Sequence, residues 1–559
     1  MNTPQKSPTV AVAIAELLAK MGARRCFGVL GTANFKITHA LSERDVQYAA
    51  ARHEAGAVSM ADAYVRLSDE FAVVSVHSGP GLTNAITAIA EAAKAKTPLL
   101  VLAGDVARGD FRSNFHIRQA DLVRSIGARF EQIESPGTAL QVAARAALAV
   151  TSERATVVLS LPVDVQDSYL PESAAVEAGA SVALPGPPPE AVVAIAEELV
   201  RAKRPLIIAG RGAVVSGAKN VLIELGDELG ALLATSAFAN GLFADEPWNT
   251  GISGGFSSPA ALNLIPQSDF VLGFGVSFTH WTTRSGQLIG KNAKVLQVDI
   301  DRSRLGVNCR IDYGITGDVS STAAALLAAL RTSRGNGQKS ARWRQPQVLD
   351  QITAGSIHKA PYTDTSTKEH IDPRTLTKEL DKILPLERVV VTDSGHFMGW
   401  PPLYFRVPDE RGWCQPTSFQ SVGLGMASAI GAALAQPHRL VTLAIGDGGL
   451  LMSLGELETA VRLGVRMCVV VYNDLAYGAE VHYFGRRQYS VDIVRFANVD
   501  FSAIARGVGA SSVEVRTVAD LAAVQKWVAE KTPGIFLIDA RITPHLEAEW
   551  HQDAFKISA

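Results

Sequence analysis

The chain has 559 residues, of which 47% are hydrophobic and 19% are charged, and its formal net charge at pH 7 is −2. This length predicts three or four domains, and the composition supplies enough apolar side chains for their cores, which excludes global disorder. The near-neutral charge excludes the basic surface of a dedicated nucleic-acid binder, and no apolar run reaches the ~18 residues that span a bilayer. We therefore expect neither a nucleic acid nor a membrane as a partner.

The start of the chain lacks the basic and then apolar pattern of a secretory signal peptide. The four cysteines are scattered along the chain without CxxC spacing, at Cys26, Cys309, Cys414 and Cys468. Such spacing excludes a disulfide framework and a structural zinc site. We therefore expect a cytoplasmic protein.

Short β-branched runs alternate with alanine-rich helical patterns along the whole chain, which is typical of parallel α/β units. The runs predict strands near residues 71–76, 98–103, 156–160, 205–210, 293–299, 389–391, 441–445 and 469–472. Two stretches interrupt this pattern, a proline-rich one at 171–190 and a polar one at 332–373, and we interpret both as linkers. The sequence therefore predicts an α/β protein with three doubly wound parallel-sheet domains, at 1–175, 190–330 and 370–545.

A glycine-rich motif, Gly446-Asp447-Gly448-Gly449, separates the strand expected at 441–445 from a helical pattern. Its glycines allow a phosphate to approach the backbone at a helix N-terminus, and Asp447 offers an oxygen for a magnesium ion that bridges two phosphates. The next strand ends at Asn473, whose side-chain oxygen would lie beside Asp447, and a main-chain oxygen near Leu475 would add a ligand. Alone, Gly-Asp-Gly also fits an ordinary turn, but its combination with Asn473 favours a metal and diphosphate site.

This combination resembles the cofactor motif of thiamine-diphosphate (ThDP) enzymes of the acetolactate synthase/pyruvate decarboxylase superfamily. In that family an Asn-Asn pair usually follows Gly-Asp-Gly further along the chain, and the second Asn is Asp474 here. The resemblance implies a pyrimidine-binding, a central nucleotide-binding-like and a diphosphate-binding domain, with ThDP and Mg²⁺ as cofactors. It makes Asp447, Asn473 and Leu475 the metal ligands. It also implies cofactor contacts from Gly446, Gly448, Gly449, Tyr477 and Gly478.

Two segments of the first domain resemble the family's pyrimidine-binding region. In the segment 51–66, Glu54 matches the glutamate that hydrogen-bonds the pyrimidine and drives its tautomerisation, although an exposed helix glutamate fits that segment equally well. In the segment 77–84, the resemblance implies cofactor contacts from Gly79, Pro80 and Asn84. Because Glu54 and Asp447 lie in different domains, family precedent implies active sites between two subunits, in a homodimer or a homotetramer.

Two loops of the third domain resemble the rest of the cofactor pocket. Val422 matches the apolar residue beneath the thiazolium ring, and the carbonyl of Gln420 matches the acceptor for the 4′-amino group. Simple helix packing also accounts for that segment. Gly395, His396 and Phe397 match the loop that meets the diphosphate from the opposite side.

The segment after Asn473 carries the residues expected to direct the reaction. Glu480 follows at the spacing at which decarboxylase-type relatives have a proton-handling glutamate, and His482 is a candidate acid or base near neutral pH. Both also fit a solvated helix face. His116 and Arg118 are able to bind a carboxylate or phosphate of a substrate, or to form a surface ion pair.

The resemblance implies an enzyme that cleaves a pyruvate-like 2-oxo acid with loss of CO₂ and ligates the carbanion to a second carbonyl compound. A non-ligating decarboxylase or C–C lyase is the alternative, and a catalytically silent scaffold subunit with the ThDP fold is a third interpretation. FAD in the middle domain stays open, since the glycine segments 210–213 and 273–277 fit relatives with and without flavin. A dehydrogenase is disfavoured because no GxGxxG follows the first strand.

Overall fold

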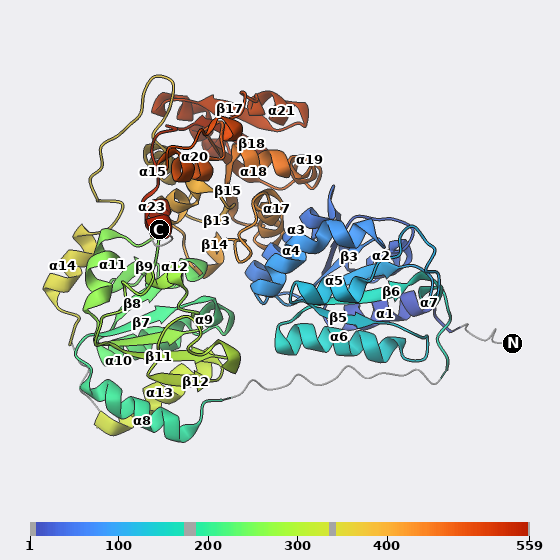
Figure 1. Cartoon of the computed structure of the whole chain (residues 1–559), viewed down its shortest axis with the longest axis horizontal. Coiled ribbons are helices and arrows are strands. Elements are labelled where there is room, and N and C mark those ends of the chain that lie inside the picture. Colours follow the sequence, from blue (N-terminus) through green and yellow to red (C-terminus); the bar gives the residue numbers. More distant parts are fainter. Residues whose placement is uncertain (1–6, 173–185, 335–341, 557–559) are drawn as a thin grey trace.

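The computed structural model of the protein describes residues 7–172, 186–334 and 342–556. These residues form three six-stranded sheets with flanking helices, and each sheet is built from one stretch of the chain (Figure 1). Neighbouring strands run parallel in all three sheets. The predicted α/β fold with three parallel-sheet domains is therefore confirmed.

The N-terminal domain alternates strands and helices in the order α1 (Val10–Lys20), β1 (Arg25–Gly28), α2 (Phe35–Ser42), β2 (Gln47–Ala50), α3 (Glu54–Ser68), β3 (Ala72–Val76), α4 (Pro80–Lys94), β4 (Leu99–Asp105), α5 (Gln119–Ser125), β5 (Arg129–Gln132), α6 (Ala139–Glu153), β6 (Thr156–Pro162) and α7 (Val163–Gln166). The strand order in its sheet is β2-β1-β3-β4-β6-β5. The central strands β3 and β6 are buried at every position, as strands covered on both faces require.

The middle domain follows with α8 (Pro189–Arg201), β7 (Pro205–Ala209), α9 (Arg211–Val215), α10 (Lys219–Leu229), β8 (Leu232–Thr235), β9 (Asn249–Ile252), α11 (Pro259–Leu264), β10 (Phe270–Phe274), α12 (His280–Thr283), β11 (Lys294–Asp299), β12 (Tyr313–Thr316) and α13 (Val319–Arg334). Its sheet has the order β12-β11-β10-β7-β8-β9. The chain therefore reverses its direction of winding between β7 and β10, which creates a crevice at the carboxyl ends of these two strands.

The C-terminal domain comprises α15 (Pro373–Ile383), β13 (Arg388–Thr392), α16 (Trp400–Tyr404), β14 (Trp413–Cys414), α17 (Gly425–Ala435), β15 (Leu440–Gly446), α18 (Asp447–Met452), α19 (Gly455–Arg462), β16 (Met467–Asn473), α20 (Gly478–Gly485), α21 (Phe501–Gly507), β17 (Ser511–Val515), α22 (Ala522–Ala529), β18 (Ile535–Arg541) and α23 (Glu549–Lys556). Its strand order is β14-β13-β15-β16-β18-β17. Strand β16 is buried throughout, and β15 is buried up to its last residue.

The N-terminal and C-terminal domains share one hydrophobic core within the chain, at the seam where α3 packs along α17 (Figure 1). Gly431 of α17 lies against the backbone carbonyl of Met60, so any Cβ at this position would clash. Small residues therefore bring the two helices into close contact. This packing fixes α3, which begins at Glu54, against the domain that carries Asp447.

Parts of both predicted linkers, 173–185 and 335–341, lie outside the described residues. Within the second predicted linker, the structure forms the helix α14 (Pro346–Ala354), which packs against α11 of the middle domain. Across the described ranges, the structure contains no helix with the length and apolar character needed to cross a bilayer.

Candidate active site

A cavity of about 470 Å³ opens in the C-terminal domain where strands β13, β15 and β16 end. Carboxyl ends of parallel strands are where ligands bind in open α/β sheets. The cavity brings together most of the residues predicted from the third domain, namely Gly395, His396, Phe397, Gln420, Val422, Gly446, Asp447, Gly448, Gly449, Tyr477, Gly478 and Glu480.

The glycines of the motif after β15 are required by their neighbours. A Cβ on Gly449 would clash with the carboxylate of Asp393, and a Cβ on Gly448 would lie 2.8 Å from a ring carbon of Tyr477. A Cβ on Gly478 would clash with the carboxylate of Asp474. The backbone therefore lies closer to these side chains than any other residue type would permit.

The carboxyl groups of Asp447 and Asp474 both line the cavity at this edge of the sheet. Burial raises the pKa of Asp447 to about 6. The pKa of Asp474 rises to about 8, first because the carboxyl group is buried and second because Asp447 carries a negative charge nearby. Two buried carboxylates are costly without a compensating cation, so this pair fits a divalent metal ion.

The carboxylate pair alone does not complete a coordination shell. The structure forms no group of three or more His, Cys, Asp or Glu able to hold a metal, in so far as its residues are described. A hard cation at this position would take its remaining oxygens from the backbone, from water and from a bound diphosphate, as Mg²⁺ does. The residues present therefore fit Mg²⁺ held jointly with a diphosphate.

The oxygens of the predicted metal ligands Asn473 and Leu475 make hydrogen bonds within the protein. The side-chain amide of Asn473 donates a hydrogen bond of 2.8 Å to Asp539, and its side-chain oxygen accepts the Leu475 N–H at 3.2 Å. The carbonyl of Leu475 accepts the Phe496 N–H at 2.8 Å. Asp474 and Ala476 line the cavity instead. Successive residues at a strand end point to opposite sides, and this alternation was the signal available in the sequence.

The loop 417–425, which carries Gln420 and Val422, is held at its later end by Asp393. The fully buried carboxylate of Asp393 accepts the N–H groups of Gly423 at 2.9 Å and Gly425 at 3.3 Å. Burial raises the pKa of Asp393 to about 6. The side chain of Val422 keeps 39% of its surface exposed and lines the cavity.

The same loop is held at its other end by a carboxylate from the N-terminal domain. Glu91 of α4 accepts the backbone N–H groups of Ser418 at 2.9 Å and Phe419 at 2.6 Å. Arg66 of α3 lies 3.0 Å from Glu91 and 2.7 Å from Asp62, and all three side chains are buried. Glu91 belongs to no local motif and could not be predicted, whereas Asp393 begins the segment of Gly395, His396 and Phe397 and only its hold on the loop 417–425 was not predicted.

Glu54, Gly79, Pro80 and Asn84 form a second group, in the N-terminal domain. The side-chain amide of Asn84 donates a hydrogen bond of 3.0 Å to the Glu54 carboxylate. Gly79 has a φ of +60°, and a Cβ there would lie 2.8 Å from the carbonyl oxygen of Phe115. The residues that line the cavity come from Trp281 and from 394–551, so none of this group lines the cavity of its own chain.

Comparison with known proteins shows to which family the chain belongs. The thiamine pyrophosphate enzyme family models match in chain order: the N-terminal TPP binding domain at residues 8–124, the central domain at 192–326 and the C-terminal TPP binding domain at 393–540. The chain belongs to the thiamine-diphosphate-dependent enzymes. ThDP is therefore its cofactor, and the family membership that the sequence motifs implied is confirmed.

Several curated ThDP-family relatives are similar over most of the chain. A sulfoacetaldehyde acetyltransferase of Alcaligenes xylosoxydans xylosoxydans is 28% identical, over 93% of this chain and 90% of the relative. A probable acetolactate synthase large subunit of Methanocaldococcus jannaschii is 29% identical, over 86% and 84%. The probable 2-ketoarginine decarboxylase of Pseudomonas aeruginosa is 31% identical, over 85% and 84%.

A solved structure described as a thiamin diphosphate-dependent enzyme from Mycobacterium smegmatis superposes on this chain with a TM-score of 0.78. The two chains are 22% identical, and the match covers 96% of this chain and 100% of the other. The two chains therefore share the same fold over all three domains of the ThDP enzyme.

The predicted catalytic residues of the ThDP enzyme do not all reach its cavity. Glu480 of α20 lines the cavity, whereas the ring of His482 packs on the ring of His396, with 4.4 Å between the centroids. Burial lowers the pKa of His482 to about 4. Trp550 and His551 of α23 also line the cavity, and the sequence argument missed both because helix α23 is distant in sequence from every motif.

The other two charged candidates lie in the N-terminal domain of the ThDP enzyme. Arg118 is 85% exposed and forms an ion pair of 3.2 Å with Asp121. The ring of His116 packs edge-on against Phe111, with 5.3 Å between the centroids. Arg118 therefore shows the surface ion pair that the sequence also allowed.

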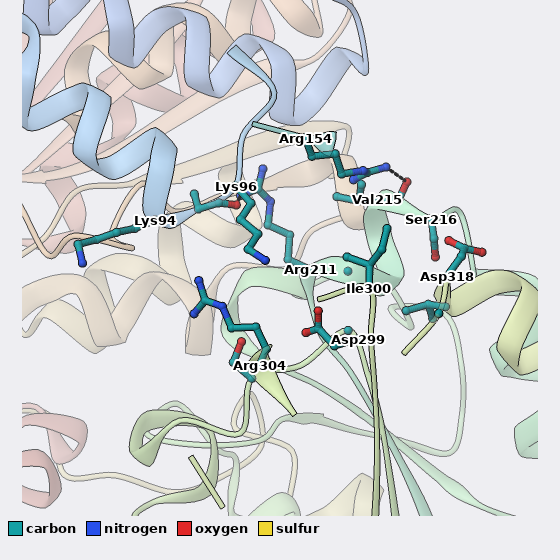
Figure 2. A pocket seen from close by; sticks show the side chains of 16 residues that line it. Lys94, Lys96, Arg154, Arg211, Val215, Ser216, Asp299, Ile300, Arg304 and Asp318 are labelled. Atoms are coloured by element: carbon teal, nitrogen blue, oxygen red, sulfur yellow. Dashed lines mark hydrogen bonds between the residues drawn. The ribbon is translucent and has the colours of Figure 1, made fainter. Parts of the chain in front are cut away.

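A second cavity of the ThDP enzyme, of about 180 Å³, lies between its N-terminal and middle domains (Figure 2). It sits at the carboxyl ends of β7, β10 and β11, beside the crevice where the direction of winding reverses. Arg211 crosses the seam and donates a hydrogen bond of 3.1 Å to Thr97. The cationic side chains that line the cavity outnumber the acidic ones, and they are Lys94, Lys96, Arg154, Arg211 and Arg304. Cations in such a crevice suit the phosphates of a nucleotide.

Proposed function

We propose that the protein is a ThDP- and Mg²⁺-dependent carboligase of the acetolactate synthase type. It cleaves a pyruvate-like 2-oxo acid with loss of CO₂ and joins the remaining acyl unit to a second carbonyl compound. The observation that carries this proposal is a cavity that is lined by the buried pair Asp447 and Asp474 together with Trp281 and Trp550. Relatives named as an acetolactate synthase and an acetyltransferase support transfer of the acyl unit.

The roles of the chain's own residues follow from their positions. Asp447 and Asp474 would hold Mg²⁺ together with the diphosphate of ThDP, in place of the pair Asp447 and Asn473 expected from the motif. Val422 would support the cofactor from beneath, and the Gln420 carbonyl would accept from its amino group. When bound, ThDP supplies the electron sink that stabilises a carbanion next to the reacting carbon.

The apolar wall of the cavity favours ligation over simple decarboxylation. Trp281 of the middle domain and Trp550 of α23 pack together, with 5.9 Å between their ring centroids, and Ile542 lies beside them on the cavity wall. Such a wall excludes water, and exclusion of water protects a reactive carbanion from being protonated before a second carbonyl compound arrives.

We propose a homodimer, or a homotetramer built from such dimers, in which Glu54 of one subunit serves the cavity of another. The separate Glu54 group and cavity of one chain support this arrangement. Large apolar side chains are exposed beside both surfaces and would be covered by a second copy; they are Phe115, Val422, Leu451 and Met452.

We propose that the second cavity binds a phosphate-bearing nucleotide, and FAD is one candidate. Gly212, Gly275 and Ser277 of the predicted glycine segments line this cavity beside Arg211. The visible absorption spectrum of the purified enzyme is the test for FAD, because only a flavin nucleotide absorbs there. A colourless protein that releases an adenine nucleotide on denaturation would assign the cavity to a nucleotide without flavin.

We also place the enzyme in the cytoplasm. All four cysteines are free thiols, and three of them, Cys26, Cys414 and Cys468, are buried. Free thiols in these numbers suit a reducing compartment. Localisation of a tagged full-length chain tests this assignment.

Incubation with pyruvate, ThDP and Mg²⁺, followed by quantification of acetolactate and acetaldehyde, tests the proposed reaction. Acetolactate as the main product is the expected result. Acetaldehyde as the sole product would favour the second candidate, a non-ligating decarboxylase or C–C lyase, which Glu480 on the cavity wall and the 2-ketoarginine decarboxylase relative support. Absence of ThDP binding would favour a silent scaffold subunit.

A further inference from the structure

Trp281, on the short helix α12, is the residue through which the middle domain reaches the cofactor cavity. The other described residues that line this cavity lie at 394–551. Helices α12 and α23 are side by side where the middle and C-terminal domains meet (Figure 1), and the rings of Trp281 and Trp550 pack together there, with 5.9 Å between their centroids. One wall of the cavity is therefore an aromatic pair that two domains supply.

A third cavity, of about 190 Å³, lies against the same aromatic pair. Trp281 and Trp550 line both this cavity and the cofactor cavity, and no other described residue lines both. The remaining lining of the third cavity is mostly polar, and it consists of Gly255, His280, Arg284, Ser285, Gln287, Asp553 and Ala554. The aromatic pair is therefore the boundary between the cofactor cavity and a neighbouring polar space.

The backbone that carries Trp281 is held in place by the loop that precedes α11. The carbonyl of Trp281 accepts the Gly255 N–H at 3.1 Å, and the carbonyl of Thr282 accepts the hydroxyl of Ser253 at 2.9 Å. Gly254 has a φ of +132°, and a Cβ there would lie 2.3 Å from the carbonyl oxygen of Trp281, so this close approach requires glycine. Helix α12 is therefore fixed at the position that brings Trp281 to the cavity.

The second ring of the pair is fixed by the C-terminal domain. The indole N–H of Trp550 donates a hydrogen bond of 3.1 Å to the carbonyl of His396, and a Cβ on Gly399 would clash with the Trp550 ring. Arg284, directly after α12, forms an ion pair with Asp553 of α23. These contacts join the two helices, so neither ring is free to move aside and open the third cavity.

We propose that Trp281 is a specificity-determining residue that restricts the enzyme to 2-oxo acids with short side chains. The inference rests on the proposed function. Cofactor and substrate share one cavity of about 470 Å³, and Trp281 closes it toward the third cavity. A longer side chain would have to displace a ring whose backbone and stacking partner are both fixed, which a close-packed protein interior resists.

The two tryptophans differ in how they are suited to this role. Trp550 anchors α23 through its hydrogen bond to His396, so its truncation would also disturb the helix that covers the cavity. Truncation of Trp281 leaves that hydrogen bond and the ion pair between Arg284 and Asp553 in place. Its main effect would be to join the cofactor cavity to the third cavity.

The first test measures kcat/KM for pyruvate, 2-oxobutanoate, 2-oxopentanoate and 2-oxohexanoate. We expect kcat/KM of the wild type to fall along this series, and the ratio of 2-oxohexanoate to pyruvate to rise by about 10-fold or more in Trp281→Ala, with Trp281→Phe in between. Because the ratio compares two substrates on one protein, partial loss of folded enzyme leaves it unchanged. A wild-type ratio in Trp281→Ala would overturn the proposal.

Trp248→Ala is the matched control, because Trp248 is also a partly buried tryptophan of the middle domain but lines neither cavity. We expect this variant to keep the wild-type ratio of 2-oxohexanoate to pyruvate. A rise in the ratio equal to that of Trp281→Ala would mean that any loosening of the middle domain relaxes the selection, and it would overturn the role of Trp281.

The second test needs no turnover, so it separates failure of this inference from failure of the proposed function. Trp281→Ala should leave a space of indole size beside the cofactor cavity, and cavities made by truncation bind small apolar molecules. We expect calorimetry to show that indole binds the ThDP-loaded Trp281→Ala variant and not the ThDP-loaded wild type. Such binding without turnover of any 2-oxo acid would support Trp281 as the boundary and refute the proposed reaction. Equal indole binding by the two proteins would overturn the inference, whether or not a 2-oxo acid is turned over.

Discussion

Glu91, on helix α4 of the N-terminal domain, accepts the backbone N–H of Phe419 at 2.6 Å, across the seam between the first and third domains. Phe419 directly precedes Gln420, which lines the cofactor cavity together with Val422. Because Asp393 holds the other end of the same loop, two buried carboxylates determine the shape of the surface beneath the cofactor. The N-terminal domain of a chain therefore organises the cavity of that same chain.

Glu91→Gln is expected to loosen this loop. The amide keeps one acceptor oxygen, but its NH₂ group would face a backbone N–H, and Arg66 would lose one of its two carboxylate partners. Breaking a buried ion pair of this kind costs about 3–5 kcal/mol. We expect a lower midpoint of urea unfolding and a larger dissociation constant for ThDP, measured by quenching of tryptophan fluorescence.

Glu16→Gln is the matched control, because it breaks the exposed pair of Glu16 with Lys20 on α1 and removes the same charge. An exposed pair of this type contributes less than about 0.5 kcal/mol. If the Glu91 and Glu16 variants shifted the unfolding midpoint equally, Glu91 would have no special role at the seam.

Asp474→Ala is expected to weaken Mg²⁺ binding more than Asn473→Ala does. Asp474 lines the cavity with Asp447, whereas Asn473 uses its side chain to join β16 to Asp539 of β18. Loss of one carboxylate ligand should raise the Mg²⁺ concentration for half-maximal ThDP binding by about 10-fold or more, and Asp474→Asn should lie between the two. Asn473→Ala should instead lower thermal stability, since it removes one of the donors to the buried Asp539 and leaves Arg541 as its partner.

The Mg²⁺ titration also decides between the interpretation from the motif and the one from the structure. If Asp474→Ala needed the same Mg²⁺ concentration for half-maximal ThDP binding as the wild type, and Asn473→Ala needed a much higher one, Asn473 would be the metal ligand. Asp447→Ala serves as the reference, because both interpretations make Asp447 a ligand.

Much of the fold and half of the site could be predicted from the sequence, because the decisive residues lie in local motifs. Asp447 and Gly395 each follow a strand, so a pattern of a few residues places them at the carboxyl edge of a sheet, and Val422 lies in the loop just before α17. Side-chain direction at Asn473 and Asp474 could not be predicted in this way, because it depends on which face of the strand end each residue occupies.

The remaining residues of the site depend on contacts between distant parts of the chain. Glu91 and Phe419 are 328 residues apart, and Ala548 and His396 are 152 residues apart. Such pairs have no local signature, and only the packing of α3 on α17 or of α23 on the middle domain brings them together. A single sequence therefore reveals the cofactor but leaves the residues around the substrate undetermined.

The buried histidines beside the cavity predict a loss of stability in acid. Burial lowers the pKa of His482 to about 4, below its ordinary value, and Glu547 and Arg486 act on it in opposite directions. His482 in the unfolded chain binds a proton near pH 6.5, so its contribution to the free energy of unfolding is constant above that pH and falls as the pH decreases from about 6.5 to 4. Because the His482 ring is partly exposed and solvent screens it, its contribution over this window is well below the about 3 kcal/mol that a fully buried ring with this shift would give.

His482→Gln should therefore flatten the decrease in the unfolding midpoint between pH 7 and pH 5, measured by circular dichroism. His39→Gln is the control, since His39 is an exposed residue of α2. An equal slope in the wild type and His482→Gln would show that other groups govern acid unfolding.

Subunits that carry different inactivating changes are expected to restore activity to each other. Glu54 does not line the Asp447 cavity of its own chain, so the proposed two-subunit site would take its glutamate from one subunit and its metal ligands from the other. Glu54→Gln and Asp447→Asn should each abolish turnover as homodimers. In a mixed dimer one of the two symmetric sites would combine both changes, and the other would contain neither. Co-expression with two affinity tags, followed by tandem purification and assay, isolates the mixed dimer. Its turnover should approach half that of the wild type, whereas an inactive mixed dimer would show that each chain completes its own site.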